Sequence, residues 1–126
     1  MNKYIIFVII FVFFNLSIFS VTNEEKALAG FYQYKITEDT QFLSGTDYES
    51  FICIVLFQDG RYVKYEKTIN KINKLDIKYK PINNGVFNVD KGLLYLQPLV
   101  GMFEIYYIKT DRLIGNYTDF VYIKVE

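Results

Sequence analysis

The sequence predicts an all-β fold, in which an antiparallel meander of about eight strands closes into a small barrel preceded by a short helix. After Gly30 the chain consists of short apolar stretches separated by turn sequences, with no apolar repeat of helical period. Tyrosine and phenylalanine, which suit half-buried pleated surfaces, stay abundant there. Closure of a meander removes its exposed edges. A two-sheet sandwich is the alternative.

The first twenty residues have the pattern of a secretory leader. Lys3 gives a positive start, residues 4–14 are an unbroken apolar run, and residues 15–20 are mixed and small. We expect cleavage after Ser20, or else after Ser17, and hence a secreted or periplasmic protein. An uncleaved anchor is the alternative, although a membrane-spanning helix needs about 20 apolar residues. The expected organisation is therefore a signal peptide over 1–20 and a single barrel domain over 21–126, with no membrane span after cleavage.

Local signals place the elements of the mature chain. A short helix is expected over residues 22–30, because capping residues and two glutamates stand at its start and Gly30 can end it. The expected strands are 31–36, 51–57, 61–67, 77–80, 86–89, 93–96, 103–109, 113–117 and 120–125. Hairpin turns are predicted at residues 58–60 and 90–92, and a turn cluster at 81–85.

The first hairpin predicts which side chains face inward. If residues 58–60 form a three-residue loop, Val55 pairs with Val63 and an apolar face results. The side chains expected to line the interior and to bind a ligand there are Tyr32, Cys53, Val55, Phe57, Val63, Tyr65, Phe87 and Tyr107. The opposite face, which carries Ile52, Ile54 and Leu56, is also apolar, and the helix is a candidate to cover it.

Charge limits the partners of the protein. The mature part carries 13 basic and 14 acidic residues, so its net charge is near −1. This balance argues against nucleic acid or an anionic membrane surface as the partner. The remaining partners are a small apolar ligand or a protein of the cell envelope.

The side chains of common catalytic and metal sites are scarce. The chain has no histidine, and Cys53 is its single cysteine. These absences exclude a histidine-based triad, a thiolate zinc cluster and an internal disulfide, and we expect Cys53 to be a small buried hydrophobe. Asp59, Asp90, Asp111 and Asp119 stand at predicted turns, and the other carboxylates are expected to be turn residues or solvated strand positions. Glu104 lies in a strand otherwise rich in apolar residues, and a second carboxylate paired with it would allow a hydrolase. We expect no enzyme, no cofactor and no metal.

Several tyrosines lie in the predicted strands. Tyr95, Tyr106, Tyr107 and Tyr122 could line a cavity. Core packing or packing on the outer surface is the simpler interpretation of these aromatic positions.

The order of motifs resembles that of small exported lipocalin-like barrels. Gly30-Phe31-Tyr32, residues 55–62 (VLFQDGRY), residues 85–87 (GVF) and residues 93–96 (LLYL) follow one another as in the N-terminal domain of NlpE-type envelope proteins. The resemblance covers about residues 30–125 and implies a closed or nearly closed eight-stranded barrel in the envelope. The lipid-modified cysteine and the Cys-x-x-Cys pair of that family are not present, so lipid anchoring and copper handling are not implied.

Together these observations predict a non-enzymatic exported barrel that binds a small apolar ligand or a protein partner. A filled-core interaction or structural module is the alternative, because an eight-stranded barrel can hold one ligand or be filled by side chains. An interior cavity of a few hundred cubic ångströms would favour the ligand.

Overall fold

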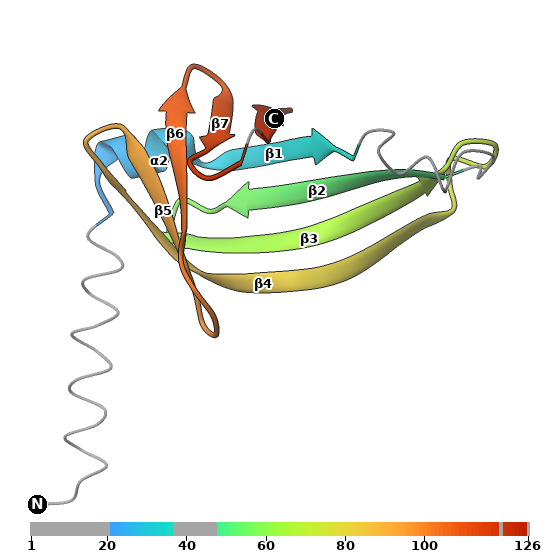
Figure 1. Cartoon of the computed structure of the whole chain (residues 1–126), viewed down its shortest axis with the longest axis horizontal. Helices are drawn as coiled ribbons and strands as arrows, with labels where there is room; N and C mark the ends of the chain where they lie inside the picture. Colours follow the sequence, from blue (N-terminus) through green and yellow to red (C-terminus); the bar gives the residue numbers. More distant parts are fainter. Residues whose placement is uncertain (1–20, 37–47, 119, 126) are drawn as a thin grey trace, which may run out of the picture.

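The described part of the chain forms one short helix and eight antiparallel strands that close into a barrel (Figure 1). This computed structural model describes residues 21–36, 48–118 and 120–125, so the predicted leader lies outside the described residues. Each strand pairs with the next in sequence, and β8 pairs back with β1. The predicted fold class, an all-β barrel of lipocalin-like strand number preceded by a short helix, is confirmed.

The elements follow the predicted order. They are α2 (Asn23–Leu28), β1 (Gly30–Lys35), β2 (Tyr48–Leu56), β3 (Arg61–Asn70), β4 (Ile77–Asp90), β5 (Leu93–Pro98), β6 (Glu104–Lys109), β7 (Arg112–Gly115) and β8 (Val121–Lys124). In the part of the chain that is described, α2 is too short to cross a membrane, and no longer apolar helix is found.

Both predicted hairpin turns are confirmed. The Phe57 amide donates to the Arg61 carbonyl at 2.9 Å, and Gly60 has a φ of 91°, as a three-residue loop requires. The second turn uses Lys91 and Gly92, with φ values of 51° and 79°; two successive positive φ values define the tight turn that matches strand twist. Val55 consequently pairs with Val63, as predicted.

The turn cluster predicted at residues 81–85 is wrong, because β4 runs through it as one strand. Pro81 is tolerated because this part of β4 pairs with β3 alone, and an edge strand can lack an N–H. Gly85 marks a close approach and not a turn: a Cβ there would lie 1.9 Å from the Gln97 carbonyl oxygen of β5. Between these residues a β-bulge leaves Ile82 unpaired.

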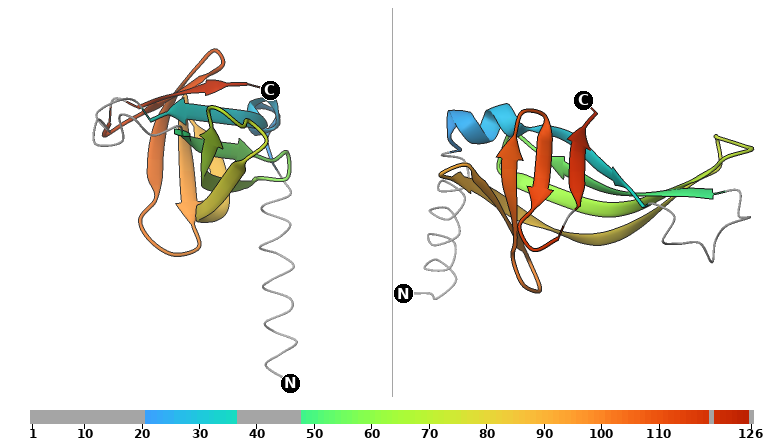
Figure 2. Two further views of the ribbon diagram at one scale, coloured as in Figure 1. Left: turned by 90° about the vertical axis from the view of Figure 1, so that its right-hand side faces the viewer. Right: turned by 45° about the horizontal axis from the view of Figure 1, so that its top comes forward.

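Three strands are longer than the barrel. The beginning of β2, the end of β3 and the beginning of β4 extend beyond the other strands as a curved three-stranded arm (Figures 1 and 2). Among the described residues, the ladder of β1 ends at Phe51 on β2, with one further bond from the Ile36 amide to the Ser50 carbonyl, and β5 meets β4 only from Gly85. The arm strands therefore pair mainly with one another. The turn at residues 71–76 forms the tip of the arm.

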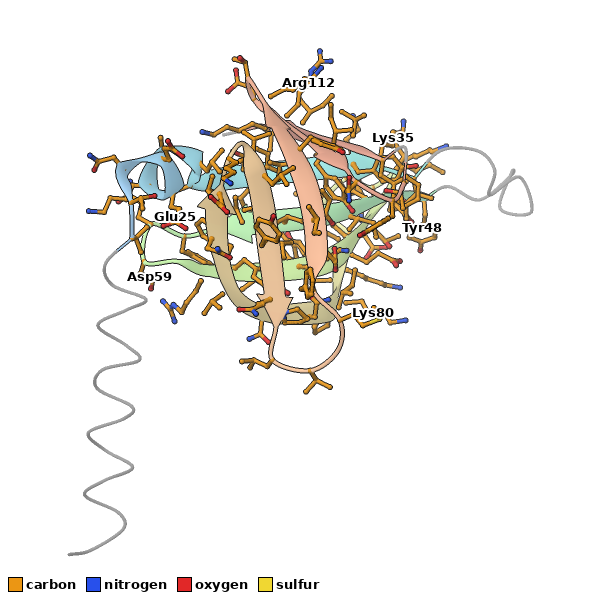
Figure 3. The ribbon with its side chains drawn as sticks, turned by 60° about the vertical axis from the view of Figure 1, so that its left-hand side comes forward. Glu25, Lys35, Tyr48, Asp59, Lys80 and Arg112 are labelled. Carbon is orange, nitrogen blue, oxygen red and sulfur yellow. The ribbon has the colours of Figure 1, made fainter. Side chains whose placement is uncertain are left out.

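The core fills the end of the barrel next to α2. Its buried members are Tyr32, Ile54, Leu56, Tyr62, Phe87, Leu94, Leu96, Tyr106, Leu113 and Tyr122, and Leu28 of α2 packs against them. The Tyr32 hydroxyl donates to the Leu28 carbonyl at 2.8 Å, and the buried Glu25 accepts the Val89 amide of β4 at 2.8 Å (Glu25 is labelled in Figure 3). These bonds attach the helix to β1 and β4.

The predicted inward face of the first hairpin is wrong. Ile54, Leu56 and Tyr62 belong to the core, and successive side chains of a strand point to opposite faces. The residues alternating with them, Cys53, Val55, Val63 and Tyr65, therefore lie on the outer face, and Phe57 and Tyr107 are exposed. The pattern was misleading because the true inner face of β3 carries Lys64. Of the candidates, Tyr32 and Phe87 lie in the core.

Candidate ligand cavity at the open end of the barrel

A cavity of about 410 Å³ occupies the end of the barrel opposite α2. It lies where β6 and β8 begin and β7 ends. Its lining consists of Ile52, Lys64, Ile82, Phe103, Glu104, Ile105, Tyr106, Gly115, Asn116, Tyr117, Thr118, Phe120 and Tyr122. The barrel is therefore filled by side chains at the α2 end and hollow at the other, and the volume is of ligand size.

An ion pair crosses the barrel at the wall of this cavity. Lys64 Nζ on β3 donates to Glu104 Oε1 on β6 at 2.8 Å, and the Tyr106 hydroxyl donates to the same oxygen. The side chains of Lys64 and Glu104 are only 14% and 27% exposed. Burial opposes the ionisation of Glu104, but the hydrogen bonds from Lys64 and Tyr106 outweigh it and lower the pKa of the carboxyl.

Two tyrosines beside this pair, Tyr106 and Tyr122, remain neutral. Burial, with the neighbouring Tyr122 and Glu104, raises the pKa of Tyr106 well above its ordinary value. Burial and the Glu104 carboxylate likewise raise the pKa of Tyr122. The two rings pack edge to face with centroids 5.6 Å apart. Among the described lining residues, the cavity thus has one ionised pair and otherwise uncharged side chains.

The connection between β7 and β8 forms one rim of the cavity. The Gly115 amide donates to the Phe120 carbonyl and the Asn116 amide to the Ile105 carbonyl, each at 3.0 Å. A Cβ on Gly115 would lie 2.3 Å from Thr118 Oγ1, so any larger residue here would force the Thr118 side chain to move.

The bulge in β4 supplies the opposite wall. Lys64 pairs with Asn83 and Tyr65 with Pro81, so Ile82 has no partner residue on β3. Ile82 lines the cavity and is 44% exposed. Bulges commonly redirect a side chain next to a site, and this one contributes an aliphatic surface at the junction of barrel and arm.

None of the eight predicted site residues lines this cavity. Tyr32 and Phe87 lie in the filled half, and the other six lie on the outer surface or in exposed positions. Of the four tyrosines considered from the sequence, Tyr106 and Tyr122 line the cavity. Tyr95 lines a smaller hollow of about 270 Å³ with Asn88, Asp90, Gln97 and Phe103.

The sequence held one signal for the cavity that was missed. Lys64 and Glu104 carry opposite charges; Glu104 lies in an otherwise apolar stretch, and Lys64 stands between Val63 and Tyr65. Because an unpaired charge in an apolar interior is costly, two such residues of opposite sign are candidates to meet. The two residues are forty positions apart in the sequence, so local sequence patterns do not indicate that they pair.

The cavity suits a mainly apolar molecule with a polar end. Most of its lining is aliphatic or aromatic, and Glu104 is the one carboxylate among the described residues of the lining. Across the described ranges, no group of three or more histidine, cysteine or acidic side chains is placed to hold a metal ion. A comparison with known protein families, with curated proteins and with solved structures found no match.

Proposed function

We propose that this protein is a non-enzymatic, exported barrel that binds one small, mainly apolar ligand in the cavity at its open end. The observation that carries the proposal is the cavity itself, with a volume of about 410 Å³ and mostly apolar walls. Small-molecule sites are typically concave and apolar, with a few polar groups that orient the ligand.

The polar groups indicate which ligand end the cavity would accept. Lys64 has three N–H donors, and Glu104 takes one of them. Its remaining donors, at the cavity wall, suit a hydroxyl, carbonyl or carboxylate oxygen of the ligand. The apolar remainder of the ligand would pack against Ile82, Phe103 and Phe120.

A hydrolase has less support. Glycosidases need two carboxyl groups about 5 to 10 Å apart, and among the described lining residues Glu104 is the one carboxylate. That carboxylate accepts hydrogen bonds from Lys64 and Tyr106.

Export is supported by the leader-like residues 1–20 and by the resemblance to NlpE-type envelope barrels.

The proposal is tested by filling the cavity. Ile82→Trp adds bulk at a cavity position, whereas Ile123→Trp adds the same bulk on the outer face of β8, at a position that is 51% exposed. We expect an anionic apolar dye, anilinonaphthalene sulfonate, to bind the purified protein and to bind Ile82→Trp about tenfold more weakly. Ile123→Trp should bind like the parent.

Native mass spectrometry of protein purified from its producing cells adds a second readout. A bound small molecule present in the parent and in Ile123→Trp, but lost from Ile82→Trp, would support the proposal. Equal dye binding by both variants, or no dye binding by the folded parent, would contradict the ligand-binding proposal.

A second function is favoured by the apolar outer face of the first hairpin. Val55, Val63 and Tyr65 share this face with Phe31, and the Phe31 and Tyr65 rings pack with centroids 6.3 Å apart. An envelope protein could bind there without using the cavity. A partner captured from envelope extract by the parent and by Ile82→Trp, but lost with Val63→Asp, would support this function.

A further inference from the structure

The loop between β5 and β6 exposes an unbroken apolar surface. Its residues 99–103 read Leu-Val-Gly-Met-Phe and carry no charge. Val100 and Met102 are 87% and 88% exposed, and Leu99 and Phe103 are also mostly exposed. Single exposed apolar residues are ordinary, but four within five positions form a patch that calls for an explanation.

This apolar loop protrudes from the barrel at the open end. It forms a projecting hairpin connection in the ribbon views (Figures 1 and 2). The Leu99 amide donates to the Asn84 carbonyl at 3.0 Å, which fixes the base of the loop to β4. Phe103 at its other end lines the cavity. The loop therefore stands at the cavity mouth, with its most exposed residues pointing away from the core.

The strand that supports the loop leads into a basic segment. Residues 66–80 hold five lysines and two acidic residues, whereas the whole chain is neutral. Lys78 and Lys80 are exposed on β4 (Lys80 is labelled in Figure 3), and Lys80 lies two residues from the cavity-lining Ile82. The near-neutral average charge thus conceals a positive segment that runs from the arm along β4 to Lys80, just before the part of β4 that lines the cavity.

We propose that the open end of the barrel docks on an anionic lipid bilayer, with the apolar loop entering the interface and the lysines of β4 contacting lipid headgroups. A short protruding loop without charges can enter a bilayer surface, whereas it offers a protein partner little area. Apolar side chains combined with nearby lysines are what binding to anionic lipid requires. The proposal does not depend on a ligand in the cavity.

Vesicle flotation tests the surface directly, with vesicles of phosphatidylcholine alone or mixed with phosphatidylglycerol. We expect the mature protein to bind the mixed vesicles and Val100→Ser/Met102→Ser to bind them at least about tenfold more weakly. Ile72→Ser/Leu75→Ser removes two equally exposed residues, 78% and 93%, at the tip of the arm and should have little effect. Loss of binding in this control alone would assign docking to the arm and overturn the role of the loop.

A second pair of variants tests the contact of the β4 lysines with lipid headgroups. Lys78→Glu/Lys80→Glu should lose binding to the mixed vesicles, whereas Lys109→Glu/Arg112→Glu, at the exposed β6–β7 turn near the α2 end, should not. If both double variants lost vesicle binding equally, binding would depend on the net charge of the protein alone. That result would contradict a defined docking face. If the folded parent bound no vesicle, the docking proposal would be overturned. Dye binding by the parent would still test, separately, whether the cavity binds a ligand.

A fluorescent reporter locates the loop in the bilayer. The chain contains no tryptophan, so Val100→Trp introduces a single fluorophore. Its emission should shift to shorter wavelength when mixed vesicles are added, and the emission of Ile123→Trp should not. A shift in both variants, or in neither while the protein floats with the vesicles, would contradict insertion of this loop.

Discussion

At the scale of single residues, the pair between Lys64 and Glu104 explains why the inner face of β3 can be charged. An exposed ion pair contributes little to stability, but removal of one partner from a buried pair leaves an uncompensated charge. Lys64 is the more buried of the two, so it depends more on its partner.

Glu104→Gln is therefore expected to lower the free energy of unfolding by about 2 kcal/mol, measured by urea denaturation at neutral pH. The pair of Lys35 and Glu49 gives a matched control, since its atoms are 3.7 Å apart and both side chains are more exposed. Glu49→Gln should cost less than about 0.5 kcal/mol. Equal costs would show that burial does not strengthen the inner pair.

The pH dependence of this contribution has a defined sign. Because the pKa of Glu104 is lowered in the folded protein from its ordinary value of 4.5, its stabilisation is present above that value. It is lost as the pH falls through the lowered folded value. The difference in stability between the parent and Glu104→Gln should therefore shrink in acid, and a difference that grows in acid would contradict the assignment.

Cys53 is free and fully buried, as predicted, although it lies on the outer face of the barrel. Burial raises the pKa of its thiol, against smaller opposing effects of Lys67 and Tyr65. We expect a thiol-specific reagent such as dithionitrobenzoate to react with the native protein far more slowly than with the protein in denaturant. Rapid reaction without denaturant would show that the cover formed by neighbouring side chains opens.

The side-chain prediction failed for a physical reason that these residues illustrate. The central part of the outer face, with Cys53, Val55, Val63 and Tyr65, is apolar, while the inner face contains Lys64, so a rule that places apolar residues inside selects the wrong face. Only knowledge of the distant Glu104 would reverse the choice. The register, by contrast, depends on the local turn at Gly60 and was predicted correctly.

At the scale of elements, β4 shows how proline and glycine can mark something other than a turn. Gly85→Ala should lower the free energy of unfolding by about 2 to 3 kcal/mol, because its Cβ would collide with the β5 backbone. Gly92→Asn is the control, since asparagine tolerates positive φ and nothing lies within 4 Å of a Cβ there. It should cost below about 1 kcal/mol, and thermal unfolding would separate the two.

The same strand limits what could be predicted from the sequence. Strands flanked by hairpin glycines were located to within a few residues. Where a strand passes a bulge, an edge proline and a glycine in close approach, local turn signals favour a break that tertiary pairing removes. The cavity wall at Ile82 depends on that bulge and was missed for the same reason.

At the scale of the whole molecule, buried tyrosines should limit alkaline stability. Burial and the nearby Asp111 carboxylate raise the pKa of Tyr32 to about 12, and burial also raises the pKa of Tyr62, Tyr106 and Tyr122. Their neutral forms are favoured in the folded state, so the stabilisation is complete below the ordinary tyrosine pKa of 10.0 and is lost as the pH rises through the folded values.

We therefore expect cooperative unfolding in strong alkali, in which tyrosinate absorbance and circular dichroism change together. Ionisation of these phenols in separate steps with the fold intact would contradict their shared burial. Tyr122→Phe removes one such proton and should move the alkaline midpoint upward, after correction for any change at neutral pH.

The filled end of the barrel has a kinetic consequence. With side chains closing the barrel beside α2, a ligand of the proposed site would have one passage, at the open end. By microscopic reversibility, entry and exit through that passage would share one transition state. A change confined to that passage must alter the association and dissociation rate constants by one common factor and leave the equilibrium constant untouched, so residence time and affinity can be varied separately in this protein.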